Sequence, residues 1–554
     1  MPEHRTPGSS GFRRPPSSGD PWSGSSTRGD SWNASSRPEA RSWTWRTPKS
    51  PRTGAAGRSP PTAPPGSAER ESQGPTPCTS PTLPPCWPPD GFRASSFPVR
   101  DSRPCWGSRI SDCWTISERC ATSALLPLDS GADAVRALRF DVTSSGFVRA
   151  RTLGRLSESA VFGPLSNLRL ADVPEPGLDA PGKLATGWVG LDVLACGICG
   201  TDLGTLGFTA SPALEPFGSF PAVLGHEILA RVREVGPGVT GLEPGQRVSV
   251  DPFLTCEIRG YAAGAHCPSC RDGRHATCEK AGEEGPAQIG DKLLSPGLTM
   301  GYHRDLPGGF GERMVAHASQ LFPVPDALDD RTAVLTEPLS VGIHAVLNAG
   351  VHPDEDILVI GSGPIAMGVI WALRATGFRG SITAQTKRAH EAEMATRLGA
   401  TNAVKPGLEA REAVIATGSH AYQPILGDEV FSGGGFPLVF DCVGNGGSLK
   451  QALRWTAPRG TLVMLGCAAE IPKLDLTFLW ARELTMKGFV GHGWESWEGG
   501  RRHSFQITHE LLVATGAPLR DLVTHTFPLA EYREAFSVAA NHRRSGALKV
   551  VLEP

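Results

Sequence analysis

Short apolar stretches, interrupted by glycine and proline, fill the sequence between residues 187 and 252. They read GWVGLDVLACGICGTD and AVLGHEILARVREVGPGVTGLEPGQRVSVDP. Alternating apolar and polar positions bounded by turn residues indicate short β-strands, and GPGV and LEPGQRV are turn signals that join strands. We expect antiparallel strands that form a compact, barrel-like domain, with VRALRF from Val135 as its first strand.

A different pattern begins near residue 340, where buried strands alternate with helices. DILVIGSGPIAMGVIWALRATG predicts a strand, a glycine turn and an apolar helix. GSITAQT predicts a second strand, and RAHEAEMATRLGA predicts a helix that ends at Gly399. PLVFDCVGNGG and GTLVMLGC predict two further strands, separated by the helical SLKQALRWTA. Strands that alternate with helices imply an α/β fold with a parallel, doubly wound sheet.

After about residue 485 the chain returns to irregular pieces. LRDLVTHTFPLAEYREAFSVAA follows, and ALKVVLEP predicts a last strand. We therefore expect a first domain over 135–340, a nucleotide-binding domain over 341–484, and a return of 485–554 to the first domain.

Residues 1–134 differ from the rest of the chain in composition. They hold 22 of the 49 prolines, and Arg, Ser, Gly and Thr fill most of the gaps. Because such a stretch buries too little apolar surface to offset its ordering entropy, we expect disorder. The one exception is SALLPLDSGADAV, where we expect a weak element of secondary structure.

Three interpretations of this N-terminal segment compete. It is a functional disordered tail, or it is an organelle transit peptide, since its start is rich in Arg and Ser and poor in acidic residues. The third interpretation, which we favour, is that it is not part of the natural protein. No methionine lies between Met1 and Met300, and a valine codon at Val135 can serve as an alternative start. Mass spectrometry of the native N-terminus distinguishes the three.

Charge, hydropathy and cysteine usage narrow the class of protein. The formal net charge is −2, so no overall field draws the chain to nucleic acid or to an anionic membrane. No apolar run reaches the roughly 20 residues of a membrane helix, and the N-terminus lacks the apolar core of a secretory signal. Thirteen cysteines fit metal ligands and free thiols better than a secreted disulfide framework. We expect a cytoplasmic protein without nucleic-acid or membrane partners.

The segment GSGPIA has the features of a dinucleotide-binding turn. Gly361 follows an apolar strand and permits the tight turn, and Gly363 lets the backbone approach a pyrophosphate at the start of a helix. The third glycine of the usual G-x-G-x-x-G pattern is Ala366 here, which relaxes helix–strand packing. The alternative is an ordinary glycine-rich strand–helix turn.

The end of the second strand bears on the choice of cofactor. NAD sites usually place an Asp or Glu there, to bind the ribose 2′-hydroxyl. Here Thr386 stands at that position, and Lys387 and Arg388 follow. Because two cations without a carboxylate can bind a 2′-phosphate, we predict NADP(H) over NAD(H). The alternative is that the cations form a solvated helix start.

Four cysteines are spaced as C-x10-C-x2-C-x7-C within residues 256–278. Four thiolates suit a tetrahedral structural zinc without an open position. Several unrelated core thiols, or a nucleic-acid zinc ribbon, are the alternatives. We expect a structural-zinc lobe, whose ligands are Cys256, Cys267, Cys270 and Cys278.

A second set of possible ligands is scattered along the chain: Cys199, His226, Glu227 and Glu337. A catalytic zinc needs about three protein ligands and an exchangeable position. One thiolate, one imidazole and one carboxylate would meet that need. Each residue alone also has an ordinary structural interpretation, as a core cysteine, a turn or a helix start.

From about residue 135 to 554, the chain resembles the zinc-dependent medium-chain dehydrogenase/reductase family of alcohol, polyol, threonine and glucose dehydrogenases. The matching motifs are GICGTD, GHE, the four-cysteine lobe, GGFGERMV, EPLSVGIHA, GSGPIA and FDCVG, in the family's order. The resemblance implies a GroES-like β-barrel catalytic domain and a Rossmann domain. Within GSGPIA and FDCVG we also expect Pro364, Ile365 and Val443 to bind the cofactor.

The resemblance implies roles around the catalytic zinc. Cys199 and His226 match its two invariant-type ligands, and Glu227 matches a carboxylate that binds the metal or exchanges with substrate. Glu337 matches the acidic residue at or beside the metal, and it begins the EPLS motif that is shared with polyol and glucose dehydrogenases. Which of the two glutamates binds zinc directly is left open.

Two further roles lie in GICGTD. Thr201 matches the hydroxyl that relays the substrate proton, and Asp202 matches an acid that orients the ligand histidine. Cys196, three residues before Cys199, is expected to end a core strand as a small apolar residue.

Three features depart from the family pattern. Gly204 stands where many relatives carry the histidine at the outer end of the proton relay. Ten residues separate Cys256 from Cys267 where relatives usually have two, so Cys256 could fail to reach the structural metal. The third departure is Ala366.

The expected activity is a zinc-dependent transfer of hydride between an alcohol, polyol or sugar hydroxyl and NAD(P). A simple alcohol or aldehyde dehydrogenase and a non-catalytic NADP-binding relative are the alternatives. The expected partners are one small-molecule substrate and further copies of the chain, as a homodimer or homotetramer.

Overall fold

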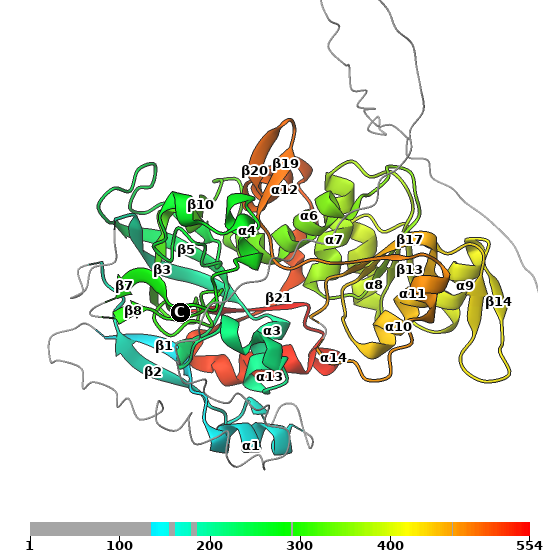
Figure 1. Cartoon of the computed structure of the whole chain (residues 1–554). Coiled ribbons are helices and arrows are strands. Elements are labelled where there is room, and N and C mark those ends of the chain that lie inside the picture. Colours follow the sequence, from blue (N-terminus) through cyan, green and yellow to red (C-terminus); the bar gives the residue numbers. More distant parts are fainter. Residues whose placement is uncertain (1–133, 155–160, 179–185, 290–291, 468) are drawn as a thin grey trace, which may run out of the picture. The chain divides into compact units, whose positions relative to one another are not determined.

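A computed structural model describes residues 134–154, 161–178, 186–289, 292–467 and 469–554 (Figure 1). The N-terminal segment 1–133 lies outside the described residues, and with it the expected disorder and most of the weak element. The expected first strand is confirmed as β1 (Ala134–Phe140), in which apolar side chains alternate into the core.

The first part of the structure is built on a mainly antiparallel sheet, in the order β10-β6-β5-β3-β22-β21, with β9 paired to the other part of β3. Its strands are β3 (Trp188–Gly197), β5 (Glu227–Val235), β6 (Arg247–Val250), β9 (Arg313–His317), β10 (Leu321–Pro323), β21 (Val523–Pro528) and β22 (Lys549–Glu553). The register of β3 and β5 places Gly197 opposite Glu227. The last strand of the chain, β22, pairs with β3 on its other side, at Cys196 and Gly197. β3 leads directly into the GICGTD motif.

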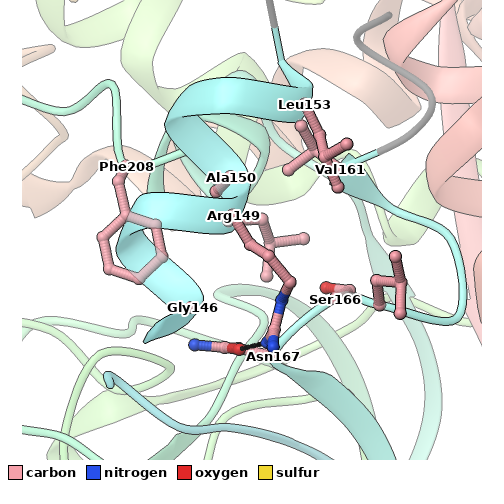
Figure 2. Close-up of a pocket in the computed structure, with 10 residues that line it drawn as sticks. Gly146, Arg149, Ala150, Leu153, Val161, Ser166, Asn167 and Phe208 are labelled. Carbon is pink, nitrogen blue, oxygen red and sulfur yellow. Dashed lines mark hydrogen bonds between the residues drawn. The ribbon is translucent and has the colours of Figure 1, made fainter. Parts of the chain in front are cut away.

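A smaller three-stranded sheet accompanies it, in the order β2-β1-β4, with β2 at Leu168–Pro174 and β4 at Ala222–Val223. Beside it, α1 (Ser144–Leu153) lines a small pocket (Figure 2), together with Val161, Leu165, Ser166, Asn167, Leu206 and Phe208. A Cβ placed on Gly146 would lie 1.8 Å from Asn167 Nδ2, and Arg149 donates to Asn167 Oδ1 at 2.7 Å. None of the residues that line this pocket is a candidate site residue.

The parallel sheet has the order β13-β12-β11-β16-β17-β18, and each neighbouring pair is parallel. Its strands are β11 (Ile357–Ile360), β12 (Ile382–Gln385), β13 (Asn402–Val404), β16 (Phe436–Asp441), β17 (Thr456–Met464) and β18 (Thr485–Gly488). This is the doubly wound order that the alternating pattern predicts. The sheet runs to Gly488, four residues past the expected boundary at 484.

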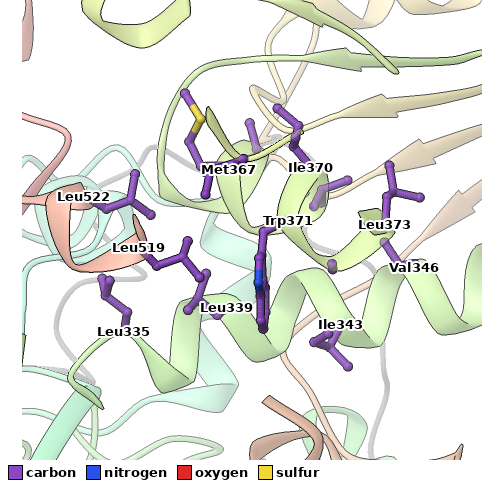
Figure 3. Close-up of a cluster of buried hydrophobic side chains, with 14 of the residues drawn as sticks. Leu335, Leu339, Ile343, Val346, Met367, Ile370, Trp371, Leu373, Leu519 and Leu522 are labelled. Atoms are coloured by element: carbon purple, nitrogen blue, oxygen red, sulfur yellow. The ribbon is translucent and has the colours of Figure 1, made fainter. Parts of the chain in front are cut away.

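Helices α6 (Thr336–Ala349) and α7 (Pro364–Ala375) cross closely (Figure 3). A Cβ on Gly342 would lie 2.7 Å from the carbonyl carbon of Gly368, so the crossing requires glycine at that position. Leu339, Ile343 and Trp371 pack here in one core cluster of buried side chains. This packing fixes the start of α6, where Glu337 lies.

The remaining longer helices are α8 (Ala389–Arg397), α9 (Leu408–Ala416), α10 (Gly446–Trp455), α12 (Ser504–Thr515) and α13 (Tyr532–Ala540). Short helices are α3 (Gly200–Leu206), α4 (Pro268–Arg271), α5 (Asp330–Ala333), α11 (Thr477–Ala481) and α14 (His542–Ser545). Three two-stranded ladders are β7–β8 (Gly285–Ile289, Lys292–Leu294), β14–β15 (His420–Tyr422, Val430–Ser432) and β19–β20 (Trp494–Trp497, Gly500–His503). The predicted helix before Gly399 is confirmed, and Gly399 has the left-handed φ of 109° that stops it.

Candidate active site

Cys199 lies at the N-cap of α3, directly after β3. Its backbone N–H donates to Asp202 Oδ2 at 2.9 Å, and Asp202 is fully buried. The carboxylate thereby satisfies a backbone donor at the start of the helix, where a negative charge is also favourable. The GICGTD motif thus fixes Cys199 at a rigid position at the end of a strand.

His226 and Glu227 reach the same place from the start of β5. The ligand atoms of Cys199, His226 and Glu227 all lie within 4.8 Å of one another, and both His226 and Glu227 are buried. One sulfur, one nitrogen and one carboxylate oxygen form a donor set that suits a catalytic zinc. Three of the four sequence-predicted ligands therefore come together in the structure.

The fourth predicted ligand, Glu337, lies outside this three-residue cluster. Its carboxylate faces a different residue, with Oε1 3.5 Å from His492 Nε2. Burial, and with it the Glu337 charge, raises the pKa of Glu227. Glu337 therefore lies near enough for its charge to act on the candidate zinc ligands, without belonging to their cluster.

Thr201 and Asp202 lie beside His226, as the motif predicts. Thr201 Oγ1 is 3.4 Å from His226 Nε2, and Asp202 Oδ1 is 3.5 Å from His226 Nδ1. Burial alone would lower the pKa of His226, but the Asp202 charge and hydrogen bond raise it well above its usual value. Asp202 is placed to orient the imidazole.

Tyr302 completes this network and was not identified from the sequence. Its hydroxyl lies 2.7 Å from Asp202 Oδ1 and 3.1 Å from Thr201 Oγ1, and its ring centroid is 5.4 Å from that of His226. Because a carboxylate only accepts, the hydroxyl hydrogen goes to Asp202, and the oxygen can accept from Thr201. Burial and the Asp202 charge raise the pKa of Tyr302 well above its usual value, so it stays protonated.

Lys549 on β22 is the second residue that the sequence did not reveal. Its ammonium lies 2.6 Å from both carboxylate oxygens of Glu227 and donates to the Ile198 carbonyl at 3.2 Å. Both side chains of the pair are almost fully buried. The carboxylate lies so close to β3 that a Cβ on Gly197 would be 2.0 Å from Glu227 Oε2. In this structure Glu227 is thus an ion-pair partner as well as a possible ligand.

Cys196 is fully buried in the hydrophobic core of the first part and lies outside the ligand cluster of the described residues. Burial raises the pKa of its thiol well above the usual value. The structure therefore places the two sulfurs of CGIC in different environments, as expected.

The four cysteines of the lobe come together despite the long insertion. Their sulfurs lie within 4.8 Å of one another, and those of Cys256 and Cys278 are 3.8 Å apart. That separation is close to the edge of a tetrahedron of sulfurs about 2.3 Å from a zinc ion. Hydrogen bonds, first from Cys270, lower the pKa of the Cys278 thiol to about 5. The four sulfurs form a donor set that fits a structural zinc, and Cys256 lies with the other three cysteines despite the insertion.

The dinucleotide turn has the geometry that GSGPIA predicts. Gly361 has a φ of 127°, and Gly363 caps α7, whose first residue is Pro364, followed by Ile365. A Cβ on Gly363 would meet nothing within 4 Å, so the helix N-terminus is open to a ligand. Ala366 is buried against the helix–strand contact. Val443 lies across the turn, with its side chain 3.2 Å from a Cβ placed on Gly361.

Thr386 is buried at the end of β12, and Lys387 is exposed. Arg388 forms an ion pair with Glu391, whose carboxylate also accepts from the backbone N–H groups of residues 387 and 388 at 2.9 and 3.1 Å. The Glu391 carboxylate also accepts a hydrogen bond from the Ser362 side chain in the glycine turn. Sequence reasoning missed Glu391, although its position three residues after an N-cap is that of a capping box.

Comparison with known proteins gives two family matches. Residues 185–326 match the alcohol dehydrogenase GroES-like domain, and residues 364–504 match the zinc-binding dehydrogenase domain. Within the described residues, no helix is long and apolar enough to cross a membrane.

Three individual proteins are similar along most of the same region. L-galactonate-5-dehydrogenase of Escherichia coli K12 is 28% identical over 345 residues, 60% of this chain and 88% of that protein. A protein of Saccharomyces cerevisiae named as a diacetyl reductase that forms (R)-acetoin is 31% identical over 322 residues, 55% of this chain and 69% of that protein. A zinc-binding dehydrogenase of Sinorhizobium meliloti 1021, solved with NADP, is 25% identical with a TM-score of 0.54, over 76% of this chain and all of that one. The chain belongs to the zinc-dependent medium-chain dehydrogenase/reductase family, a family of oxidoreductases that act on alcohols and polyols with a nicotinamide cofactor.

Proposed function

We propose that this protein oxidises a secondary hydroxyl of a polyol, sugar or sugar acid, or reduces the corresponding ketone, with zinc and NADP(H). The observation that supports this most is the buried convergence of Cys199, His226 and Glu227 beside the Thr201 hydroxyl. A metal-ligand set next to a hydroxyl that can carry a proton is what alcohol oxidation requires.

The protein's own residues would fix geometry and move the proton. Thr201 takes the substrate proton at Oγ1, which lies 3.1 Å from the Tyr302 hydroxyl that positions it. Asp202 keeps both the imidazole and the Tyr302 hydroxyl oriented. As Thr201 takes that proton it gives up its own hydroxyl hydrogen. Since residue 204 is glycine and Tyr302 stays protonated, the acceptor is water rather than a histidine.

Cys199, His226 and Glu227 would hold the catalytic zinc, with Glu337 adjoining them. Zinc supplies Lewis-acid chemistry, which lowers the pKa of a hydroxyl or polarises a carbonyl. The nicotinamide supplies the hydride acceptor, and the turn of Gly361 and Gly363 would bind its pyrophosphate. Cys256, Cys267, Cys270 and Cys278 would hold a separate, structural zinc.

The names of the relatives support the proposed substrate class. L-galactonate-5-dehydrogenase, the acetoin-forming reductase and the L-threonine 3-dehydrogenases, 27% identical in Anaeromyxobacter, are named for substrates whose reacting hydroxyl lies next to an oxygen- or nitrogen-bearing carbon. We infer the same class here, in preference to simple primary alcohols. The EPLS motif at Glu337 agrees with this choice.

Zinc-replete protein should reduce NADP with a polyol, a vicinal diol or a sugar acid, and removal of zinc by a chelator should abolish the reaction. The panel should include ethanol and benzyl alcohol, which we expect to react more slowly. Turnover is read as absorbance of the reduced nicotinamide. Faster reaction with the simple alcohols would contradict the substrate class, and absence of turnover with every substrate would favour a non-catalytic NADP-binding protein.

The preference for NADP rests on the end of β12. No carboxylate occupies position 386, and the ammonium of Lys387 has no ion pair among the described residues. Arg388 is neutralised by Glu391, so Lys387 is the cation best placed for a 2′-phosphate. A charged hydrogen bond to a phosphate contributes about 1.5–3 kcal/mol.

Lys387→Ala should therefore lower kcat/KM for NADP by about 10- to 100-fold and leave kcat/KM for NAD nearly unchanged. Thr386→Asp should lower the NADP value further, by repulsion of the phosphate. Lys292→Ala, an exposed lysine on β8, serves as the charge-matched control. Equal losses with both cofactors, or an NADP preference that survives Thr386→Asp, would contradict the assignment.

A further inference from the structure

A second His/Asp cluster lies apart from the zinc ligands discussed above. Asp251 follows β6, His492 lies between β18 and β19, and His503 ends β20 at the N-cap of α12. One ligand atom from each lies within 4.8 Å of the other two. His275, at the edge of the cysteine lobe, also faces Asp251, with Nδ1 3.7 Å from Oδ2.

Asp251, His492 and His503 are buried, and several ring nitrogens at the cluster lack a hydrogen-bond partner among the described residues. Asp251, His492 and His503 are 2%, 1% and 0% exposed. Among the described residues, no hydrogen-bond partner is found for either nitrogen of His492, for His503 Nε2 or for His275 Nδ1. Buried polar atoms are nearly always satisfied, so three such nitrogens that face the Asp251 carboxylate indicate a missing partner.

The distances fit a metal ion better than direct hydrogen bonds. Asp251 Oδ2 lies 3.3 Å from His503 Nε2, and Asp251 Oδ1 lies 3.8 Å from His492 Nδ1. Hydrogen bonds between nitrogen and oxygen are about 2.7–3.2 Å long. Ligands about 2.0–2.1 Å from a tetrahedral zinc lie about 3.3–3.4 Å from one another. The 3.3 Å between Asp251 Oδ2 and His503 Nε2 matches such an edge, and the 3.8 Å between Asp251 Oδ1 and His492 Nδ1 is somewhat longer.

The second nitrogen of His492 faces a carboxylate. With Nδ1 on the metal, Nε2 carries the hydrogen, and Glu337 Oε1 lies 3.5 Å away, slightly beyond hydrogen-bond length. Metal-bound histidines commonly donate their other N–H to a carboxylate, which fixes the ring. This contact connects the cluster to the candidate catalytic site.

Metal binding by His503 would break one long hydrogen bond, the one that its Nδ1 accepts. Its Nδ1 accepts from the Phe505 N–H at 3.3 Å, which places the ring hydrogen on Nε2. Coordination by Nε2 moves that hydrogen to Nδ1 and breaks this long hydrogen bond. Burial lowers the pKa of His503 to about 4, so the imidazole is already neutral, the form that coordinates metals.

We propose that Asp251, His492 and His503 bind a divalent transition-metal ion, zinc by preference. Imidazole nitrogens with one carboxylate suit zinc, and three protein ligands leave the fourth position of a tetrahedral ion for water. The His275 side chain, which faces Asp251 from outside the three-residue cluster, is 17% exposed, so the ion can enter from its side. The ion would join the end of β6 to the segment before β19 and to the start of α12, and would orient His492 towards Glu337.

Metal counting on the full chain tests the proposal. His503→Asn keeps an N-cap side chain that can accept from residue 505 and removes a ligand. Zinc per chain, measured by mass spectrometry after dialysis against trace zinc, should fall by one equivalent in His503→Asn. His317→Asn is the matched control, because His317 also caps a helix through Nδ1 and lies outside every metal cluster of the described residues. It should leave the zinc content unchanged.

Anomalous diffraction at the zinc edge locates the ion without any variant. A peak bounded by Asp251, His492 and His503 in the wild-type protein supports the proposal, whether or not Cys199 and the cysteine lobe also show peaks. Zinc-soaked crystals with no peak there, or a His503→Asn variant that retains all its zinc, would overturn it. In that case the cluster is a metal-free His–Asp network. Because the readouts are zinc content and peak position, they do not depend on catalytic activity.

Discussion

Cys199→Ser should reduce kcat/KM by about 10³-fold or more and remove one zinc per chain, with little effect on folding. The thiolate is one of three clustered donors, and a serine hydroxyl at the same N-cap is a poor ligand for zinc. Loss of Lewis-acid assistance is worth several kcal/mol of transition-state stabilisation, and each 1.4 kcal/mol is a factor of ten. Serine preserves the N-cap of α3, so the helix should remain.

Cys196→Ser is the matched control, since it makes the same substitution three residues earlier. Cys196 is fully buried in the core, so the serine hydroxyl should cost about 1–3 kcal/mol of stability while the zinc content and kcat stay near wild type. Zinc content, thermal unfolding and kcat/KM are measured for both variants. If the two variants lose activity and zinc alike, Cys199 is not the specific ligand that the geometry suggests.

The fold was predictable because its signals are local. The strand, glycine turn and helix around Gly361 and Gly363 appear in one continuous stretch of sequence, and the alternation of strands with helices predicts the parallel order of the sheet. The boundary at 484 was less accurate, since β18 extends the sheet to Gly488. Its exposed, mixed residues carry no strong strand pattern.

The predictable part of the site also lies in short motifs. Cys199, Thr201 and Asp202 share one turn, and His226 with Glu227 forms another, so recognition of the motifs brought them together. Tyr302 and Lys549 could not be found in this way. Lys549 is 322 residues from Glu227 in sequence and meets it only because β22 pairs with β3.

The same limit applies to the His/Asp cluster. Asp251, His275, His492 and His503 come from separate segments, and none of them belongs to a metal-ligand spacing motif in the sequence. Their juxtaposition depends on where the β19–β20 ladder lies against the end of β6 and the cysteine lobe, which no local pattern encodes. Spacing motifs find metal sites only when the ligands are near in sequence, as in the four-cysteine lobe.

Lys549→Met should destabilise the zinc-free protein by about 3–5 kcal/mol, because it leaves the Glu227 carboxylate buried without a counter-charge. Both side chains are almost fully buried, and the ammonium lies 2.6 Å from each carboxylate oxygen. Methionine fills a similar volume, so the loss reports the charge rather than a cavity. Chemical unfolding of the zinc-free protein, followed by fluorescence, measures the change.

Zinc should restore part of that stability in Lys549→Met, because an unpaired Glu227 can turn to the metal as a ligand. The wild-type protein should gain less from zinc, since its Glu227 is already paired with Lys549.

The double variant Lys549→Met/Glu227→Gln removes both charges and should recover most of the lost stability, which gives a coupling energy of several kcal/mol. Lys487→Met is the control and should change stability far less, because among the described residues the Lys487 ammonium donates only to the Ala349 carbonyl, at 3.2 Å. If Lys549→Met were as stable as wild type without zinc, or the double variant no better than the single, Glu227 would not depend on Lys549. In that case only the metal would hold the Glu227 carboxylate in place, and the ion pair with Lys549 would not affect zinc binding by Glu227.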